Sequence, residues 1–252
     1  MTSLKIRLDK LLVDRGLAGS RERAQALILA GKVLVNEQKT DKSGAQVIAD
    51  ATVRLLGEDL KYVSRGGLKL ERALQHWQVE VDGKVCLDVG ASTGGFTDCL
   101  LQRGAAGVIA VDTGYGQMDF TLRQNQRVRL LEKTNARYIT AREIGKEVDL
   151  IVVDVAFISA TLVLPSVVAA AFPHSGTDRS GRQVIVLVKP QFEAGREFVG
   201  KGGIVRDESA QLAAVEKVKQ KLEELGCVRN DVIESPILGA EGNKEFLLRA
   251  VF

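Results

Sequence analysis

The sequence has few cysteines and few histidines. Its 252 residues include three cysteines, Cys86, Cys99 and Cys227, and two histidines. An odd number of widely spaced cysteines argues against a disulfide framework and predicts a protein of the reducing cytoplasm. No cysteine lies near His76 or His174 in the sequence, so the ligand spacing of a zinc site is missing as well.

The chain also lacks a signal peptide and a strong net charge. Residues 1–5 (Met-Thr-Ser-Leu-Lys) do not have the apolar core of a secretion signal. The formal net charge is +3, and the surplus lies in residues 1–62, which hold 11 Lys and Arg against 8 Asp and Glu, whereas residues 63–252 hold 24 of each. This asymmetry predicts an anionic partner for the N-terminal segment.

One uncharged stretch has the length of a membrane span. Residues 155–173 carry no charge over nineteen positions. However, Pro165 interrupts the stretch, and Asp154 stands at its start, where a single span would leave the carboxylate in a costly place. We therefore interpret this stretch as a strand end followed by a buried helix, and we predict no membrane association.

Residues 1–61 predict a small α+β domain. Apolar residues recur at helical spacing over 8–12, and Ser20 is placed to cap a second helix. Strand-like runs follow at 32–36 and 52–56, separated by a turn-rich segment. A domain of this size is marginally stable alone.

Residues 62–66 predict a linker, and residues 67–252 predict an α/β domain. Apolar runs of buried-strand type alternate there with helical patterns, which is typical of a doubly wound, Rossmann-like parallel sheet. A long amphipathic helix over 207–225 follows the last of these runs. The apolar runs cover 85–89, 108–111, 150–153 and 184–188, and two closing strands cover 228–233 and 245–251.

The loop after the first of these strands has little side chain. Residues 90–95 read Gly-Ala-Ser-Thr-Gly-Gly and lie where open parallel sheets bind ligands. Asp112 ends the next strand, where an acid accepts hydrogen bonds from ribose hydroxyls, so we predict an adenosine pocket. The loop has neither the G-x-G-x-x-G spacing of dinucleotide sites nor a Walker lysine, which favours the phosphate-free S-adenosylmethionine. A tight strand-to-helix turn is the alternative interpretation.

Two charged residues follow buried strands directly. Asp154 comes after 150–153, and Lys189 comes after 184–188. A charge at the end of a buried strand is costly unless it is paired or used in the chemistry. We therefore predict that both side chains belong to the functional site.

Four segments resemble a known family. Residues 88–96 (Asp-Val-Gly-Ala-Ser-Thr-Gly-Gly-Phe) resemble motif I of the FtsJ/RrmJ-type ribose methyltransferases, and residues 186–193 (Val-Leu-Val-Lys-Pro-Gln-Phe-Glu) resemble the TlyA (haemolysin A) group within them. The N-terminal segments 7–12 and 31–36 resemble an S4 RNA-binding domain. Thr93 and Phe96 replace the proline and tryptophan of many FtsJ-type sequences, which favours the TlyA branch. The resemblance implies S-adenosylmethionine-dependent methylation of a ribose 2′-hydroxyl, that of cytidine, in ribosomal RNA.

The resemblance also implies which residues act. A Lys-Asp-Lys-Glu tetrad carries the chemistry in the wider group, and by motif position it falls on Lys69, Asp154, Lys189 and Glu245. Lys189 is expected to accept or relay the 2′-OH proton, with Asp154 orienting it and the other two holding the ribose. From the residues alone, Lys69 is expected to be a solvated surface lysine, and Glu245 could equally be a solvated turn residue. The expected cofactor-binding residues are Gly90, Ser92, Thr93, Gly94, Gly95, Phe96, Asp112, Asn135 and Ala136; no metal is expected.

Basic residues of the small domain predict a contact with ribosomal RNA or a ribosomal subunit. Phosphate contacts through such residues give an affinity that falls with salt. The alternative is a set of charges scattered over a solvated surface. Two other functions stay open: a non-catalytic S4-type RNA-binding regulator, which has no need of Asp154 and Lys189, and a membrane-active haemolysin, which would use residues 155–173. The residues expected to face RNA are Arg7, Lys10, Arg21, Arg23, Lys32 and Arg65.

Overall fold

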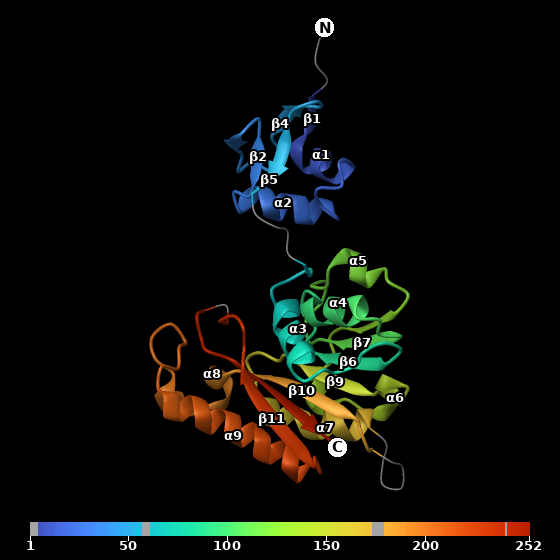
Figure 1. The fold of residues 1–252 in the computed structure, drawn as a ribbon, viewed down its shortest axis with the longest axis vertical. Coiled ribbons are helices and arrows are strands. Elements are labelled where there is room, and N and C mark those ends of the chain that lie inside the picture. The colour runs from blue at the N-terminus through green and yellow to red at the C-terminus, as the bar shows by residue number, and fades with distance from the viewer. Residues whose placement is uncertain (1–4, 57–60, 173–178, 240) are drawn as a thin grey trace. The chain divides into compact units, whose positions relative to one another are not determined.

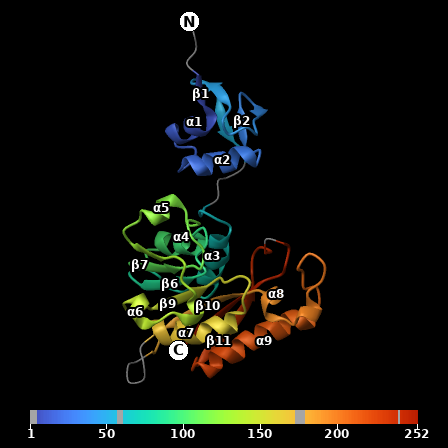
Figure 2. The same cartoon turned by 180° about the vertical axis from the view of Figure 1, so that it is seen from behind.

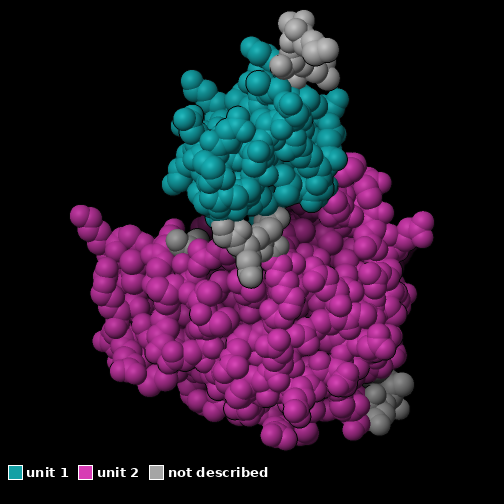
Figure 3. Space-filling view, turned by 45° about the horizontal axis from the view of Figure 1, so that its top comes forward, with its two compact units in different colours: residues 1–60 teal, residues 61–252 magenta. Residues whose placement is uncertain are grey.

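The chain divides into two compact units, residues 1–60 and 61–252 (Figure 3). The structure is a computed structural model. It describes residues 5–56, 61–172, 179–239 and 241–252.

The first unit combines two helices with two small sheets. Its elements are β1 (Lys5–Arg7), α1 (Leu8–Asp14), α2 (Arg21–Leu29), β2 (Val33–Val35), β3 (Gln38–Lys39), β4 (Gln46–Ile48) and β5 (Val53–Leu55). Strand β1 pairs with β4, and β2 lies between β3 and β5. Ser20 caps α2 as expected, because its side chain accepts a hydrogen bond from the Arg23 N–H. Aliphatic side chains such as Leu12 and Ile28 fill the core of this unit.

The second unit is built on a seven-stranded sheet in the order β11-β12-β10-β9-β6-β7-β8 (Figure 1). Strands β6 to β10 are parallel, and β12 joins the sheet antiparallel to both β10 and β11. The strands are β6 (Val85–Val89), β7 (Gly107–Val111), β8 (Val128–Leu131), β9 (Leu150–Val153), β10 (Gln183–Val188), β11 (Arg229–Glu234) and β12 (Phe246–Val251). Each apolar run identified in the sequence forms one of these strands.

Helices cover both faces of this sheet. Their bounds are α3 (Gly66–His76), α4 (Gly95–Gln102), α5 (Phe120–Arg123), α6 (Ala141–Ile144), α7 (Ala160–Ala171), α8 (Pro190–Glu193) and α9 (Glu208–Glu224), with 3-10 turns η1 (Ala136–Tyr138) and η2 (Arg196–Phe198). Successive side chains of a strand point to opposite faces, so each strand contributes to two cores. Helices α7 and α9 lie on one face of the sheet, and α3 and α4 on the other (Figures 1 and 2). Val153 belongs to the core on the first face and Val152 to the core on the second.

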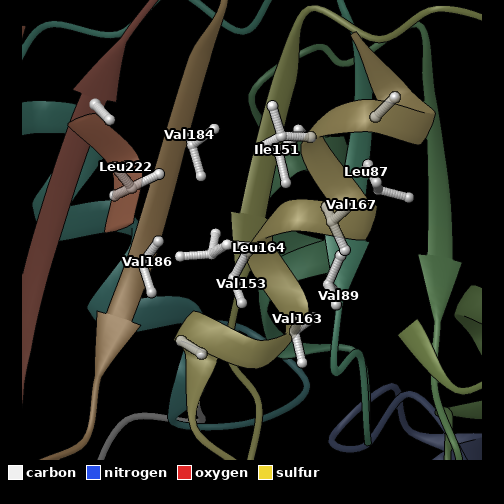
Figure 4. Packing of buried hydrophobic residues seen from close by; sticks show 14 of the residues in the cluster. Leu87, Val89, Ile151, Val153, Val163, Leu164, Val167, Val184, Val186 and Leu222 are labelled. Carbon is white, nitrogen blue, oxygen red and sulfur yellow. The ribbon is translucent and has the colours of Figure 1, made fainter. Parts of the chain in front are cut away.

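Helix α7 accounts for most of the uncharged stretch at 155–173. Leu164 and Val167 are fully buried and pack against Val153 and Val186 of the sheet (Figure 4). The stretch is therefore apolar because one face of a short helix completes the core; Pro173 lies outside the described residues. Among the helices that the structure describes, none is long and apolar enough to cross a membrane.

The expected linker packs against the second unit. Tyr62 is 2% exposed and belongs to the core under α3 and α4. A Cβ on Gly67 would lie 2.3 Å from the Tyr62 ring, so only glycine lets α3 approach this close. Helix α3 itself begins at Gly66.

Replacing Leu164 with alanine should lower the free energy of unfolding by about 2–5 kcal/mol, because it removes a fully buried side chain and leaves a cavity against the sheet. Leu162 lies on the same helix but is 47% exposed, so Leu162→Ala should change the free energy of unfolding by only about 0.5 kcal/mol. Urea unfolding measures both. Equal losses would show that α7 does not pack as described.

Candidate functional site

The candidate site lies at the edge where β6, β9 and β10 end. These strands are neighbours and run parallel, with Val153 opposite both Val89 and Val186. The segments that follow them therefore leave the sheet side by side. They begin with Gly90, Asp154 and Lys189, the residues singled out in the sequence.

The glycine loop after β6 is approached closely by other parts of the chain. Gly90 has φ +86°, and a Cβ there would lie 2.3 Å from the Asp154 carbonyl oxygen. At Gly95 a Cβ would lie 2.2 Å from the Ser64 hydroxyl oxygen. A loop with so little side chain allows other groups to approach its backbone closely. In the structure the neighbouring strand end and residues 64–67 make that approach, and two cavities open beside the loop.

The larger cavity, of about 360 Å³, lies at the ends of β6, β7 and β9. Asp112 stands on its wall, and its carboxylate is fixed by two backbone donors, the Ser92 N–H at 2.7 Å and the Gly114 N–H at 2.6 Å. Each carboxylate oxygen keeps a second lone pair for a ribose hydroxyl. The volume lies in the range of small-molecule sites. Of the expected cofactor residues, this cavity is lined by Gly90, Ser92, Asp112, Asn135 and Ala136.

Asn135 has a local structural role as well as a place at this cavity. It is the N-cap of η1, and its side-chain oxygen accepts a hydrogen bond from the Arg137 N–H at 3.0 Å. The turn that it closes places Ala136 on the cavity wall. The side-chain amide donors of Asn135 are left for a ligand edge.

A smaller cavity, of about 190 Å³, lies on the other side of the glycine loop. Asp154, Gly90 and Ser92 line both cavities, so they are adjoining compartments of one site. Lys69 reaches the smaller one from α3. The expected cofactor residues Thr93, Gly95 and Phe96 line it too, whereas Gly94 packs against Leu122, whose side chain a Cβ would meet at 2.3 Å.

The four residues of the expected tetrad form two ion pairs. Lys189 Nζ lies 2.6 Å from Asp154 Oδ1, and Lys69 Nζ lies 2.5 Å from Glu245 Oε2. Lys69 and Glu245 are both buried, at 8% and 3% exposure, so neither is the surface charge that the sequence allowed. Because Lys69 and Asp154 line the same cavity, the two pairs meet there. Buried charges of opposite sign in contact are stabilised by each other, whereas either one alone would be costly.

Asp88 of β6 is a buried acid in the motif I segment. Its side chain is fully buried, Oδ2 accepts a hydrogen bond from the Thr97 hydroxyl at 2.6 Å, and Oδ1 has no partner among the described residues. Burial raises the pKa of Asp88 to about 7, which outweighs the opposing hydrogen bond from Thr97. In the sequence, the feature that marks Asp88 is an acid inside an otherwise apolar strand.

In the first unit, a buried acid organises two of the basic residues expected to face RNA. Asp9 is fully buried and accepts hydrogen bonds from Arg7 at 2.8 and 3.0 Å, from Arg21 at 3.1 Å and from Gln25 at 2.9 Å. The hydrogen bond from Arg7 is the main reason that the pKa of Asp9 lies well below its usual range. Both guanidinium groups remain about half exposed, at 43% and 53%.

The other basic residues differ in their surroundings. Lys10 is exposed, and Lys32 and Arg23 are partly buried. Arg65 belongs to the second unit, where its guanidinium donates to the Leu238 carbonyl at 3.1 Å beside the smaller cavity. Arg65 is thus held next to Lys69 at the smaller cavity.

Phe157 was not identified from the sequence. It lies on the wall of the larger cavity, is 93% exposed and has φ +65°, a conformation that bulky residues rarely adopt. Its ring contacts that of Phe192, with 5.5 Å between the ring centroids. Only the fold places this aromatic at a ligand cavity, because the uncharged stretch around it indicated core.

Comparison with known proteins finds a matching protein family for each of the two units. Residues 62–252 match the FtsJ-like methyltransferase family, and residues 6–52 match the S4 domain. The chain is 44% identical, over 97% of its length and 89% of the relative's, to a Mycobacterium tuberculosis protein named 16S/23S rRNA (cytidine-2′-O)-methyltransferase TlyA. It is 40% identical, over 96% of its length and 98% of the relative's, to Hemolysin A of Brachyspira hyodysenteriae.

Solved structures agree with this placement. A candidate hemolysin from Streptococcus thermophilus matches with a TM-score of 0.73 at 41% identity, over 98% of this chain and 88% of that one. Aeropyrum pernix fibrillarin with bound S-adenosyl-L-methionine shares the fold, with a TM-score of 0.52 at 14% identity, over 87% of this chain and 94% of that one. The resemblance noted in the sequence and the expected fold class are confirmed.

The raised pKa of Asp88 predicts a pH dependence of stability that Asp88→Asn removes. The folded carboxyl holds its proton up to about pH 7, whereas the unfolded one releases it near pH 3.8, so this contribution to stability is lost as the pH rises between the two values. Relative to Asp88→Asn, the wild type should lose on the order of 4 kcal/mol between pH 4 and 7 and little above that. Urea unfolding at each pH measures the difference, and a flat difference would contradict the assignment.

Proposed function

Because the chain belongs to the FtsJ-like methyltransferase family, we propose that it transfers a methyl group from S-adenosylmethionine to a ribose 2′-hydroxyl of ribosomal RNA, that of cytidine. The observation that carries the proposal is the meeting of two lysine–carboxylate pairs at a cavity beside the motif I loop. The names of the relatives support the RNA substrate and the 2′-O position. In this proposal residues 67–252 are catalytic, residues 1–61 bind RNA, and residues 62–66 connect them.

The residues of the larger cavity fit S-adenosylmethionine. Asp112 would hold the ribose hydroxyls, Asn135 and Ala136 would contact the adenine, and the glycine loop would run along the methionine portion. Among the described residues, no lysine or arginine lines the larger cavity, although a pyrophosphate would need such residues, and this agrees with a cofactor that has no phosphate. When bound, the cofactor supplies a methyl group on a positively charged sulfur. Asp154, which lines both compartments, would face that charge.

Lys189 and Asp154 would manage the proton of the 2′-hydroxyl. The hydroxyl must lose its proton as its oxygen attacks the methyl carbon, and a positioned side chain accelerates this loss. With its Nζ 2.6 Å from the carboxylate, Lys189 can take the hydroxyl proton while passing one to Asp154. The pair thereby acts as a relay, and Asp154 also orients the amine.

Lys69 and Glu245 would hold the ribose in line with the methyl group. Lys69 lines the smaller cavity, and Glu245, the residue before β12, fixes its amine at 2.5 Å. Alignment of this kind supplies a large part of the rate in a two-substrate reaction. The exposed ring of Phe157 at the larger cavity offers an apolar face to the target nucleotide.

The first unit would supply RNA affinity through its arginines. The Asp9 carboxylate fixes Arg7 and Arg21 in place while leaving each half exposed, so less side-chain freedom is lost when they meet a phosphate. Their contacts would be electrostatic and independent of base sequence. Base and site selection would then fall to the second unit.

The alternatives have less support. A non-catalytic RNA-binding regulator would not need the buried pair Lys69–Glu245, which is costly to maintain. The name of the Brachyspira hyodysenteriae relative raises the membrane-active alternative. The segment that this alternative would use is largely buried in the core as α7.

Replacing Lys189 with alanine should abolish methyl transfer and leave cofactor affinity nearly unchanged, because Lys189 does not line the larger cavity, where the cofactor would lie. The transfer of a labelled methyl group to ribosomal RNA measures the first quantity, and equilibrium titration with labelled S-adenosylmethionine measures the second. Lys219→Ala on α9 is the control and should leave both unchanged. Loss of cofactor binding together with transfer would contradict the role given to Lys189.

Arg21→Ala should weaken RNA binding several-fold and lower the slope of log K against log salt by about 1, because one phosphate contact is lost. Arg54→Ala is a matched control: both side chains are 53% exposed and both are paired with an acid in the same unit, but Arg54 is outside the expected RNA face. Filter binding to ribosomal RNA at several salt concentrations distinguishes the two. If both substitutions have the same effect, the arginines act only through net charge.

A further inference from the structure

Two segments that leave the sheet at the site are joined at three points. Residues 154–160 follow β9, and residues 189–193 follow β10, the adjacent parallel strand. At the sheet edge they are joined by the Asp154–Lys189 ion pair, and further out by the ring contact of Phe157 with Phe192. The third junction, at their far ends, is the Glu193 carboxylate. The first of these contacts is the proposed proton relay, so the other two bear on its geometry.

Of Asp154, Lys189 and Glu193, Glu193 is the most buried and accepts the most hydrogen bonds. It is 6% exposed. One carboxylate oxygen accepts a hydrogen bond from the Ala160 N–H at 2.6 Å, and the other accepts one from the Ser159 hydroxyl at 2.5 Å. Both donors belong to the first turn and N-cap of α7, where backbone N–H groups have no partner within the helix. Glu193 thus ties the end of the β9 segment to the end of the β10 segment.

Lys217 of α9 supports this carboxylate from the other side. Its Nζ lies 3.5 Å from the Glu193 carboxylate and donates to the Glu193 carbonyl at 3.0 Å. Burial raises the pKa of Glu193 against the effect of these partners. Burial makes the charged form of Glu193 energetically costly, yet its carboxylate bonds to a neighbouring loop. This arrangement indicates a positioning role.

The middle of the β9 segment needs such support. Phe157 has φ +65° and is 93% exposed, so neither its backbone preference nor its own burial holds it in place. Its neighbours from Val155 to Ile158 form part of the wall of the larger cavity. The segment is therefore fixed at its ends, by Asp154 at the sheet and by Ser159 and Ala160 at Glu193.

We propose that Glu193 is a positioning residue for methyl transfer, which clamps the segment after β9 to the segment after β10 and thereby holds Asp154, Lys189 and Phe157 in their reactive arrangement. This inference rests on the proposed function. It assigns a role to the last residue of the Lys-Pro-Gln-Phe-Glu run, which that function leaves unexplained. The clamp acts by hydrogen bonds of a given reach, and the charge of Glu193 serves mainly to balance Lys217.

Three substitutions at Glu193 separate reach from charge. Glutamine keeps the reach and one acceptor oxygen and can reorient for the Ser159 hydroxyl, so Glu193→Gln should retain most of the kcat for transfer to RNA. Aspartate keeps the charge but is one methylene shorter and cannot reach both donors. Glu193→Asp and Glu193→Ala should therefore both lower kcat by about 10- to 100-fold at saturating cofactor, the cost of a misplaced reacting group. The KM for RNA should stay within about twofold, since phosphate contacts of the first unit supply that affinity.

Hydrogen exchange gives a readout that does not depend on activity. In Glu193→Ala, amide exchange should accelerate in peptides covering 154–160 and stay unchanged in β6 and β7, because only the clamp is lost. Glu197→Gln, an exposed acid in the next turn, is the control and should change neither exchange nor kcat. Thermal unfolding confirms that each variant is folded at the assay temperature.

Several outcomes would overturn the inference. One is a folded Glu193→Ala protein with a kcat within about twofold of wild type, which is less than a lost alignment costs. Another is rescue by aspartate but not by glutamine, which would make charge balance with Lys217 the role. A third is faster exchange throughout the second unit, which would indicate a general structural role. Failure of the proposed function is distinguishable, since the wild type itself would then transfer no methyl group to RNA.

Discussion

The site depends on one constraint of the sheet: β6, β9 and β10 are parallel neighbours and end at the same edge. Every segment that leaves this edge does so beside the next, so residues far apart in sequence meet without long loops. Gly90 allows one of these approaches, because any side chain there would collide with the backbone of Asp154. The glycine loop is thus as much a requirement of the sheet edge as of the cofactor beside it.

Charge at this edge is retained at a cost that pairing offsets. Lys69 and Glu245 are buried together, Lys189 and Asp154 are partly buried together, and Glu193 is satisfied by two hydrogen bonds and a lysine. Apolar residues would pack there more cheaply, and the proposed role of these charges in methyl transfer would explain the cost. The same principle appears in the first unit, where buried Asp9 is paired with the half-exposed side chains of Arg7 and Arg21.

Much of the architecture follows from local sequence pattern. The apolar runs at 85–89 and 150–153 became β6 and β9 with the expected bounds, because continuous aliphatic runs suit strands that are covered on both faces. Asp154 and Lys189 were also identifiable, since a charge directly after such a run stands at a strand end. In the first unit, β2 and β5 were expected from the runs at 32–36 and 52–56, whereas β1, β3 and β4 were missed because their two or three residues do not belong to such a run.

The sequence by itself determined which segments are buried, where they end and which charges stand at those ends. Only the tertiary structure decided the partners: Lys69 meets Glu245 across 176 positions, and Glu193 meets Ser159 across 34. The tertiary structure also decided that Phe157, which lies in an uncharged stretch, is 93% exposed at a cavity wall. Periodicity records the burial of a residue relative to its immediate neighbours, whereas the pairing of charges depends on strand order and on the water that folding removes from both partners.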